Sequence, residues 1–237
     1  MILRGPWIGR WIPLVGGLLL LACSEQTWEQ ALAEGEQAAR QRRYAEAERQ
    51  LAAAVEKAEA FGPEDLRVAR ALTHLAQVYA AQRKYVDAEP LYQRALRIYQ
   101  KVHGEHHRDV AAVLNNLGVL HRMHGQYAEA EPLLQRALSI KEVIFGHDHH
   151  EVALTMANLG QLYAAQGKYS EAEPYFKLAL AVREKSLGPD HPDVAKSLEE
   201  YAALLRTLGR ESEALPLESR AQGIRIAPPD VSSAVTR

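Results

Sequence analysis

One motif recurs along this chain at a step of 42 residues, and this repeat constrains the fold more than any other feature. Three copies keep nearly the same letters: RKYVDAEPLYQRAL at 83–96, GQYAEAEPLLQRAL at 125–138 and GKYSEAEPYFKLAL at 167–180. A decayed copy, GRESEALPLESRAQ, follows at 209–222, and RRYAEAERQLAAAV at 42–55 precedes the first by 41 residues. Periods of about 20–50 residues are typical of solenoids, in which each repeat buries its apolar face only against its neighbours.

Each repeat contains two stretches with the apolar spacing of an α-helix. In the first stretch, Leu72, Leu75, Ala76 and Tyr79 lie at i, i+3, i+4 and i+7, which forms one apolar stripe. Small residues recur in both stretches, and they would let two antiparallel helices approach closely. They are Ala76, Gly118, Gly160 and Ala202 in the first stretch, and Ala88, Ala130, Ala172 and Ala214 in the second.

A proline recurs inside the second stretch, at Pro90, Pro132, Pro174 and Pro216. Proline in a helix interior costs about 3 kcal/mol or more. The first turn tolerates it better, because the N–H groups there lack intrahelical partners. We therefore expect a slight kink at each proline and second helices that begin near Tyr85, Tyr127, Tyr169 and Glu211.

The pattern of small residue, alanine, aromatic and alanine at these offsets is similar to the tetratricopeptide repeat (TPR). The 42-residue step and the phrase LGPDHPDVA at 187–195 resemble the longer repeat of kinesin light chains. The resemblance covers residues 27–225. It implies an all-α fold, a right-handed superhelical solenoid of about five helix-turn-helix hairpins whose concave groove is lined by the first helices.

The first 22 residues have the features of a secretory signal peptide. Arg4 and Arg10 supply positive charge, and the uncharged run at 11–22 is shorter than the roughly 20 residues that span a bilayer. The run ends in the letters LLAC, which resemble the lipobox of bacterial lipoprotein precursors. The resemblance implies cleavage after Ala22 and lipidation of the Cys23 thiol. The alternative is an ordinary signal peptide with a chance cysteine.

The lipoprotein resemblance also implies a location. Residues 23–26 would form a short lipid-anchored tether, and residues 226–237, which contain two consecutive prolines, would form a disordered tail. Two or more acyl chains hold a protein stably on a membrane. Ser24 follows the cysteine, and in enteric-type bacteria a residue other than aspartate there implies the outer membrane. We expect a lipid-anchored protein of the bacterial cell envelope, in the outer membrane and facing the periplasm.

Composition and motifs argue against nucleic-acid binding, a cysteine zinc site and the common catalytic motifs. The net charge of −2 gives no electrostatic basis for binding nucleic acid. A single cysteine permits no internal disulfide and no cysteine zinc site. The sequence contains no GxSxG motif, P-loop or dinucleotide fingerprint. We expect no catalytic residues, no cofactor and no small-molecule substrate.

Histidines and glutamates recur in step with the repeat. Two groups of histidines, His103, His106 and His107 and then His147, His149 and His150, could in principle bind zinc or copper. However, His107, His149 and His191 occupy one repeat position, so the repeat explains part of the clustering, and we expect no metal site. His121 takes the core position of Tyr79 and Tyr163, and Glu89, Glu131 and Glu173 are interpreted as a solvated face.

The face of each first helix opposite the apolar stripe should line the groove. Asparagine is a poor helix former, so its recurrence in the middle of these helices needs a reason. Amides offer both donors and acceptors, which suits the backbone of an extended peptide; the alternative is that these side chains are merely solvated. The predicted peptide-binding residues are His74, Gln77, Asn115, Asn116, Arg122, Asn158 and Gln161.

Three functions remain open at this stage. The leading hypothesis is a membrane-anchored envelope scaffold that binds a protein or extended peptide in the concave groove. The second is an assembly or pilotin-type factor for a secretin, pilus or outer-membrane complex, as other TPR lipoproteins are. An enzyme or metal-binding protein comes third. The first two differ in whether loss of the protein blocks assembly of one defined machine.

Overall fold

The computed structural model describes residues 27–226. The predicted signal peptide, Cys23, the tether and residues 227–237 of the predicted tail lie outside this range. Within it the chain forms α-helices and no strands. The helices are α1 Trp28–Arg40, α2 Tyr44–Glu59, α3 Leu66–Ala81, α4 Tyr85–His103, α5 Arg108–Met123, α6 Tyr127–Phe145, α7 His150–Ala165, α8 Tyr169–Leu187, α9 Pro192–Thr207 and α10 Glu211–Ile226. None of these helices is both long enough and apolar enough to span a bilayer.

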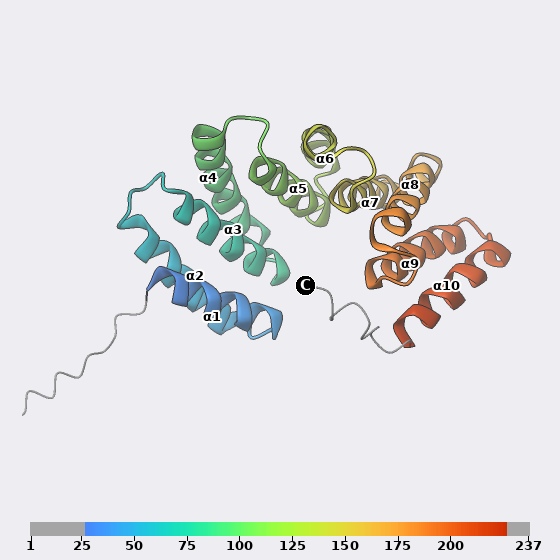
Figure 1. The fold of residues 1–237 in the computed structure, drawn as a ribbon, viewed down its shortest axis with the longest axis horizontal. Coiled ribbons are helices and arrows are strands. Elements are labelled where there is room, and N and C mark those ends of the chain that lie inside the picture. The colour runs from blue at the N-terminus through green and yellow to red at the C-terminus, as the bar shows by residue number, and fades with distance from the viewer. Residues whose placement is uncertain (1–26, 227–237) are drawn as a thin grey trace, which may run out of the picture.

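The ten helices form five antiparallel hairpins, each packed mainly against the hairpins before and after it. The hairpins are arranged in an arc: α3, α5, α7 and α9 lie on its inner side, and α4, α6, α8 and α10 lie on its outer side (Figure 1). The first helices of neighbouring repeats also contact each other: α3 contacts α5, and α5 contacts α7. The predicted all-α solenoid of five hairpins is confirmed.

The second helices begin where the repeat predicted, at Tyr85, Tyr127, Tyr169 and Glu211. The prolines, however, lie at the sixth helical residue, which is in the second turn. Because Pro90 has no N–H, the carbonyl of Val86 loses its intrahelical donor. The side chain of Val86 is 74% exposed, so water can supply the missing hydrogen bond. The corresponding residues Ala128, Ser170 and Ser212 are exposed too.

The recurrent loop histidine caps the first helix. A side-chain acceptor at the N-cap satisfies a backbone N–H that has no partner in the first turn. Asp65 does this for α3, where its Oδ1 accepts from the Arg67 N–H at 2.9 Å. In the next three repeats the acceptor is a histidine Nδ1. His107 accepts from Asp109 N–H at 3.3 Å, His149 from Glu151 N–H at 3.2 Å and His191 from Asp193 N–H at 3.1 Å.

The two helices of a hairpin approach closely at the small residue of the first helix. A Cβ added to Gly118 would lie 2.6 Å from Cγ of Leu134, which is too short for a real contact. Gly35 has the same relation to Leu51, also at 2.6 Å. At Gly160 the nearest atoms belong to the ring of Phe176, at 3.2 Å. The large residue of the second helix therefore packs directly against the backbone of the first.

The row of second-helix carboxylates does not form a solvated face, as the sequence had suggested. Each accepts from, or lies beside, a first-helix side chain of the following repeat. The Tyr163 hydroxyl donates to Oε1 of Glu131 at 2.8 Å, and the Tyr201 hydroxyl donates to Oε1 of Glu173 at 3.0 Å. Hydrogen bonds from Lys177, Arg210 and Tyr201 lower the pKa of Glu173 to about 2. These carboxylates link neighbouring hairpins.

The last repeat ends the array with polar groups. Glu218 takes the position that Tyr92, Leu134 and Phe176 hold in earlier repeats, and its carboxylate receives two hydrogen bonds from Arg206, one of them at 2.7 Å. Helix α10 buries only Ala214 and Ala221. A polar terminal repeat is what a solenoid end exposed to water requires.

Gly118→Ala should lower the free energy of unfolding by about 1–3 kcal/mol, because the new methyl group overpacks the contact with buried Leu134. Gly160→Ala should be milder, since the Phe176 ring needs to move by only a few tenths of an ångström. Gly223→Ala in α10 is the control, because nothing lies within 4 Å of its Cβ position. Alanine there should add up to about 1 kcal/mol of stability. Urea denaturation measures all three, and equal stability of the Gly118 and Gly223 variants would contradict the proposed packing constraint.

Candidate functional site

All seven predicted groove residues lie on α3, α5 and α7, the inner helices of the arc (Figure 1). Their exposure differs. Gln77 is exposed, whereas His74, Asn116, Arg122 and Gln161 are half-buried. Asn115 and Asn158 are buried, with 6% and 9% of their surface exposed. The predicted groove residues are therefore not equally available to a ligand.

Two of the asparagines bond each other across a repeat junction. Nδ2 of Asn158 donates to Oδ1 of Asn115 at 2.8 Å, joining α7 to α5. This hydrogen bond gives both residues a structural reason to stand in mid-helix. Asn116 forms no side-chain hydrogen bond within the described part of the chain, so its amide is the asparagine group left for a ligand. A role for any of the three in peptide binding stays a prediction.

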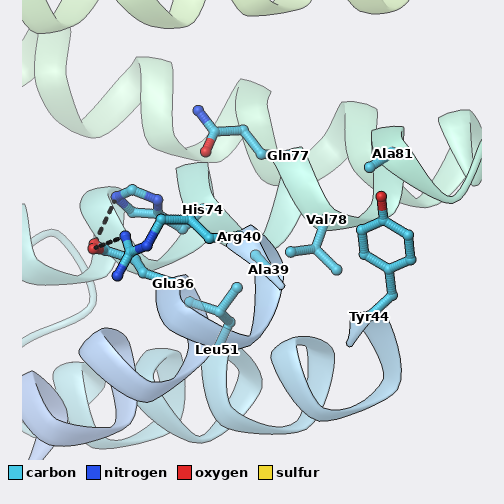
Figure 2. A pocket seen from close by; sticks show the side chains of 9 residues that line it. All are labelled: Glu36, Ala39, Arg40, Tyr44, Leu51, His74, Gln77, Val78 and Ala81. Carbon is cyan, nitrogen blue, oxygen red and sulfur yellow. Dashed lines mark ion pairs between the residues drawn. The ribbon is translucent and has the colours of Figure 1, made fainter. Parts of the chain in front are cut away.

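A cavity of about 340 Å³ opens between α1, the start of α2, and α3. Figure 2 shows Glu36, Arg40 and His74 grouped at one end of it and Tyr44 and Ala81 at the other. Oε1 of Glu36 lies 3.3 Å from Nε2 of His74, and its other oxygen lies 3.7 Å from NH1 of Arg40. Burial lowers the pKa of His74, while the Glu36 carboxylate opposes that shift. The charges of this cavity pair with one another.

A second cavity, of about 430 Å³, lies between α5, α7, α8 and α9. Nε2 of Gln161 donates to Oε1 of Glu200 at 2.9 Å. Burial raises the pKa of Glu200, and burial lowers the pKa of Arg122. Nε of Arg122 and Oε2 of Glu200 are buried without a hydrogen-bond partner. The full lining is Arg122, Gln161, Ala164, Tyr169, Phe176, Glu200, Ala203, Leu204 and Thr207.

The two cavities occupy the same place in the repeat, three repeats apart. The sequence period equates eight pairs of lining residues, among them Glu36 with Gln161, Tyr44 with Tyr169, Leu51 with Phe176, and His74 with Glu200. In the middle of the array Val119 and Met123 hold the positions of Gln77 and Ala81. The two cavities are thus lined by the same positions of the repeat, but the polar residues at those positions differ between the two ends of the array.

Within residues 27–226, one cluster could hold a metal ion: His103, His107 and Asp109, at the turn between α4 and α5. Oδ2 of Asp109 lies 3.7 Å from Nε2 of His103 and 3.5 Å from Nδ1 of His107. The two imidazole rings stack with centroids 3.9 Å apart. In the next repeat Phe145 stacks on the cap His149 at 4.6 Å, so an aromatic ring packs on the cap even where it offers no metal ligand. The cluster is therefore explained by packing and capping.

His121, expected in the core, is 9% exposed and is satisfied there by a polar partner. Its Nδ1 lies 2.9 Å from Oε1 of Gln126, and its Nε2 lies 3.8 Å from Oε1 of Glu89. The expectation of a satisfied core histidine agrees with this geometry. Glu200, by contrast, is not among the groove residues predicted from the sequence. No sequence signal distinguished it from exposed Glu199 as a cavity residue.

Five antiparallel two-helix hairpins stacked in an arc are the architecture of an α-helical repeat protein. The sequence profile of the tetratricopeptide repeat matches residues 25–101, 67–142, 125–185 and 165–227, which is most of the chain. The protein belongs to the tetratricopeptide repeat family. The family predicted from the sequence is therefore confirmed. No match was found among proteins of curated function.

Several solved structures share the fold. BtubC (BKLC) from P. vanneervenii is 24% identical, with a TM-score of 0.71 over 83% of this chain and 79% of its own. A Podosopora anserina chain of nearly identical TPR-like repeats of kinesin light chain type is 22% identical, with a TM-score of 0.67 over 83% and 94%. A Rap protein in complex with Competence and Sporulation Factor is 20% identical, with a TM-score of 0.74 over 83% and 53%. At these identities the likeness shows the fold alone.

Asn158→Ala should destabilise the protein by about 1–3 kcal/mol, because it leaves the buried Oδ1 of Asn115 without its donor. The double variant Asn115→Ala/Asn158→Ala should cost less than the sum of the two single changes. Asn116→Ala is the matched control, since its side chain has no partner to lose and alanine is the better helix former. Thermal and urea denaturation measure these effects. An Asn158→Ala variant as stable as Asn116→Ala would show that the pair contributes nothing.

Proposed function

We propose that this protein is a scaffold that binds an extended peptide segment of another protein in its concave groove. One observation carries the proposal: the inner face has two cavities, of about 340 and 430 Å³, at equivalent positions of the repeat. Between them lies the amide of Asn116, which has no partner in the described chain. Two hollows on the inner face, one of them lined by residues with an unpaired donor and acceptor, suit a chain that runs along the inner helices.

The comparison with the Rap protein supports this proposal by analogy. That structure is named as a complex with Competence and Sporulation Factor, so a fold of this kind there holds a partner. This chain spans about half of that protein, 53% of its length. The analogy therefore extends to the solenoid and not to the rest of the Rap protein.

We further propose that the scaffold belongs to the bacterial cell envelope. The support is the run that ends in Cys23, a residue outside the described range, and the stable retention that multiple acyl chains give. A lipidated Cys23 would place α1 close to the membrane, because only three residues separate it from the first described residue, Thr27. The proposed location is the outer membrane, on the periplasmic side.

A pilotin-type assembly role would be a special case of this scaffold. We also expect that the chain has no catalytic activity.

The groove can be tested with peptides selected from a displayed library of random 12-residue sequences against the full-length protein. Ala165→Arg should weaken binding of the selected peptides at least tenfold, because Ala165 is exposed at the repeat position of the cavity residues Ala81 and Thr207. Ala128→Arg is the matched control: it is also exposed, but it lies on α6, on the outer side of the arc (Figure 1). Fluorescence anisotropy measures both affinities. Equal weakening by the two variants, or weakening by Ala128→Arg alone, would place the binding site elsewhere.

The anchor has its own test. Cys23→Ser should either leave the precursor uncleaved at this site or release a soluble form, because the serine hydroxyl cannot take the thioether-linked lipid. Membrane fractionation after a high-salt wash, with mass spectrometry of the N-terminal peptide, measures the outcome. A Cys23→Ser protein that has lost its signal peptide and still fractionates with membranes would refute the lipid anchor.

A further inference from the structure

Buried polar atoms without partners are rare in folded proteins, and each needs an explanation. In the described chain there are three: Nε1 of Trp28, Nε of Arg122 and Oε2 of Glu200. Two of the three belong to residues that line the same cavity, the one between α5, α7, α8 and α9. One is an N–H donor and the other a carboxylate acceptor, so the cavity wall offers a complementary pair of unused hydrogen-bonding groups.

Arg122 and Glu200 do not satisfy each other. Their charged groups form no ion pair within 4.0 Å, whereas both partners of Glu200, Gln161 at 2.9 Å and Lys196 at 3.8 Å, contact its other oxygen, Oε1. Arg122 has no carboxylate partner within the described residues. The two side chains come from α5 and α9, the first helices of the repeats before and after the α7 repeat.

The equivalent cavity at the other end of the array behaves differently. There Glu36 lies within ion-pair distance of Arg40, Arg70 and His74, at 3.7, 3.6 and 3.3 Å. Its charges are therefore used within the protein, as the dashed lines of Figure 2 show for two of the pairs. The same position in the solenoid carries a closed set of ion pairs in one case and an open donor and acceptor in the other.

We propose that the cavity between Arg122 and Glu200 receives the carboxamide side chain of an asparagine or glutamine from a peptide bound in the groove, an inference that rests on the proposed function. Both atoms are covered in the unbound structure, so the Arg122 and Glu200 side chains turn toward the ligand when it binds. The carboxamide oxygen then accepts from Nε of Arg122, and its NH2 group donates to Oε2 of Glu200. The stem of the ligand side chain packs against Phe176 and Leu204, which are buried in the cavity wall.

Charged side chains fit this cavity less well. A lysine or arginine would pair with Glu200 but bring a second positive charge beside Arg122, and an aspartate or glutamate would meet the free oxygen of Glu200. Both arrangements place like charges together in a half-buried site, where repulsion is stronger than in water. An apolar side chain would leave both orphan atoms unpaired. A neutral group with one acceptor and one donor satisfies both.

The test uses the displayed library of random 12-residue peptides and the full-length protein. Peptides selected on the wild type should share an asparagine or glutamine at one position. Replacing that residue with leucine in a synthetic peptide should weaken binding at least about tenfold, because two hydrogen bonds to charged groups are lost. Isothermal titration calorimetry measures the affinities, and thermal denaturation verifies that each protein variant is folded.

Two protein variants should change the selected residue in opposite directions. Glu200→Gln leaves Arg122 as the charge of the cavity, so selection should shift from amides to aspartate or glutamate. Arg122→Gln removes the positive charge from the cavity lining and leaves the Glu200 carboxylate there, so selection should shift to lysine or arginine. Glu199→Gln is the matched control, because Glu199 precedes Glu200 on α9, pairs with Arg225 at 2.7 Å and lies outside the cavity lining. It should keep the amide preference.

The outcomes separate the two proposals. If wild-type binders depend on Ala165 but show no amide position, and the two cavity variants select the same peptides, the groove binds peptides and the carboxamide assignment is wrong. If the library yields no binder to the wild type, the proposed groove function fails, and the carboxamide assignment fails with it. A shift in one variant only would assign the contact to that residue alone and would overturn the paired role.

Discussion

The close approach of the two helices in each hairpin is the contact on which the rest of this structure depends. At Gly118 the backbone of α5 lies directly against the Leu134 side chain of α6, and no Cβ fits between them. This contact fixes the spacing of the hairpin, and the spacing in turn places each second-helix carboxylate beside a side chain of the following repeat, as in the hydrogen bond from Tyr163 to Glu131. Regular spacing then produces the arc and its hollow inner face.

Much of the fold could be predicted because the repeat supplies several aligned copies of one structural unit. The starts of α4, α6, α8 and α10 were predicted correctly from a motif and a proline alone. These starts place each proline at the sixth helical residue, and the exposure of residues such as Val86 explains why a missing N–H is tolerated there. The carboxylates were wrongly interpreted as solvated, because a contact with the next repeat leaves no signature in the helix that carries it.

The site was less predictable than the fold. The resemblance to the tetratricopeptide repeat correctly implied that the helices of the seven residues are the inner ones, but it does not give the relative position of two neighbouring side chains. The hydrogen bond between Asn158 and Asn115 depends on that position and joins residues 43 apart in sequence. The absence of a partner for Arg122 and for one oxygen of Glu200 depends on it as well. These contacts depend on the distances between side chains of different helices, and those distances cannot be predicted from a single sequence.

The pairing of Glu218 with Arg206 has a consequence for how molecules of this protein meet. Solenoids grow by stacking one more hairpin on an apolar end, and two copies could in principle join end to end in the same way. Here the second-helix position that is aromatic or aliphatic in earlier repeats carries a carboxylate already bound to a guanidinium. An incoming hairpin would have to bury that ion pair, which is seldom favourable. The last described repeat therefore offers an incoming hairpin a polar surface in place of an apolar one, which disfavours end-to-end stacking of two copies.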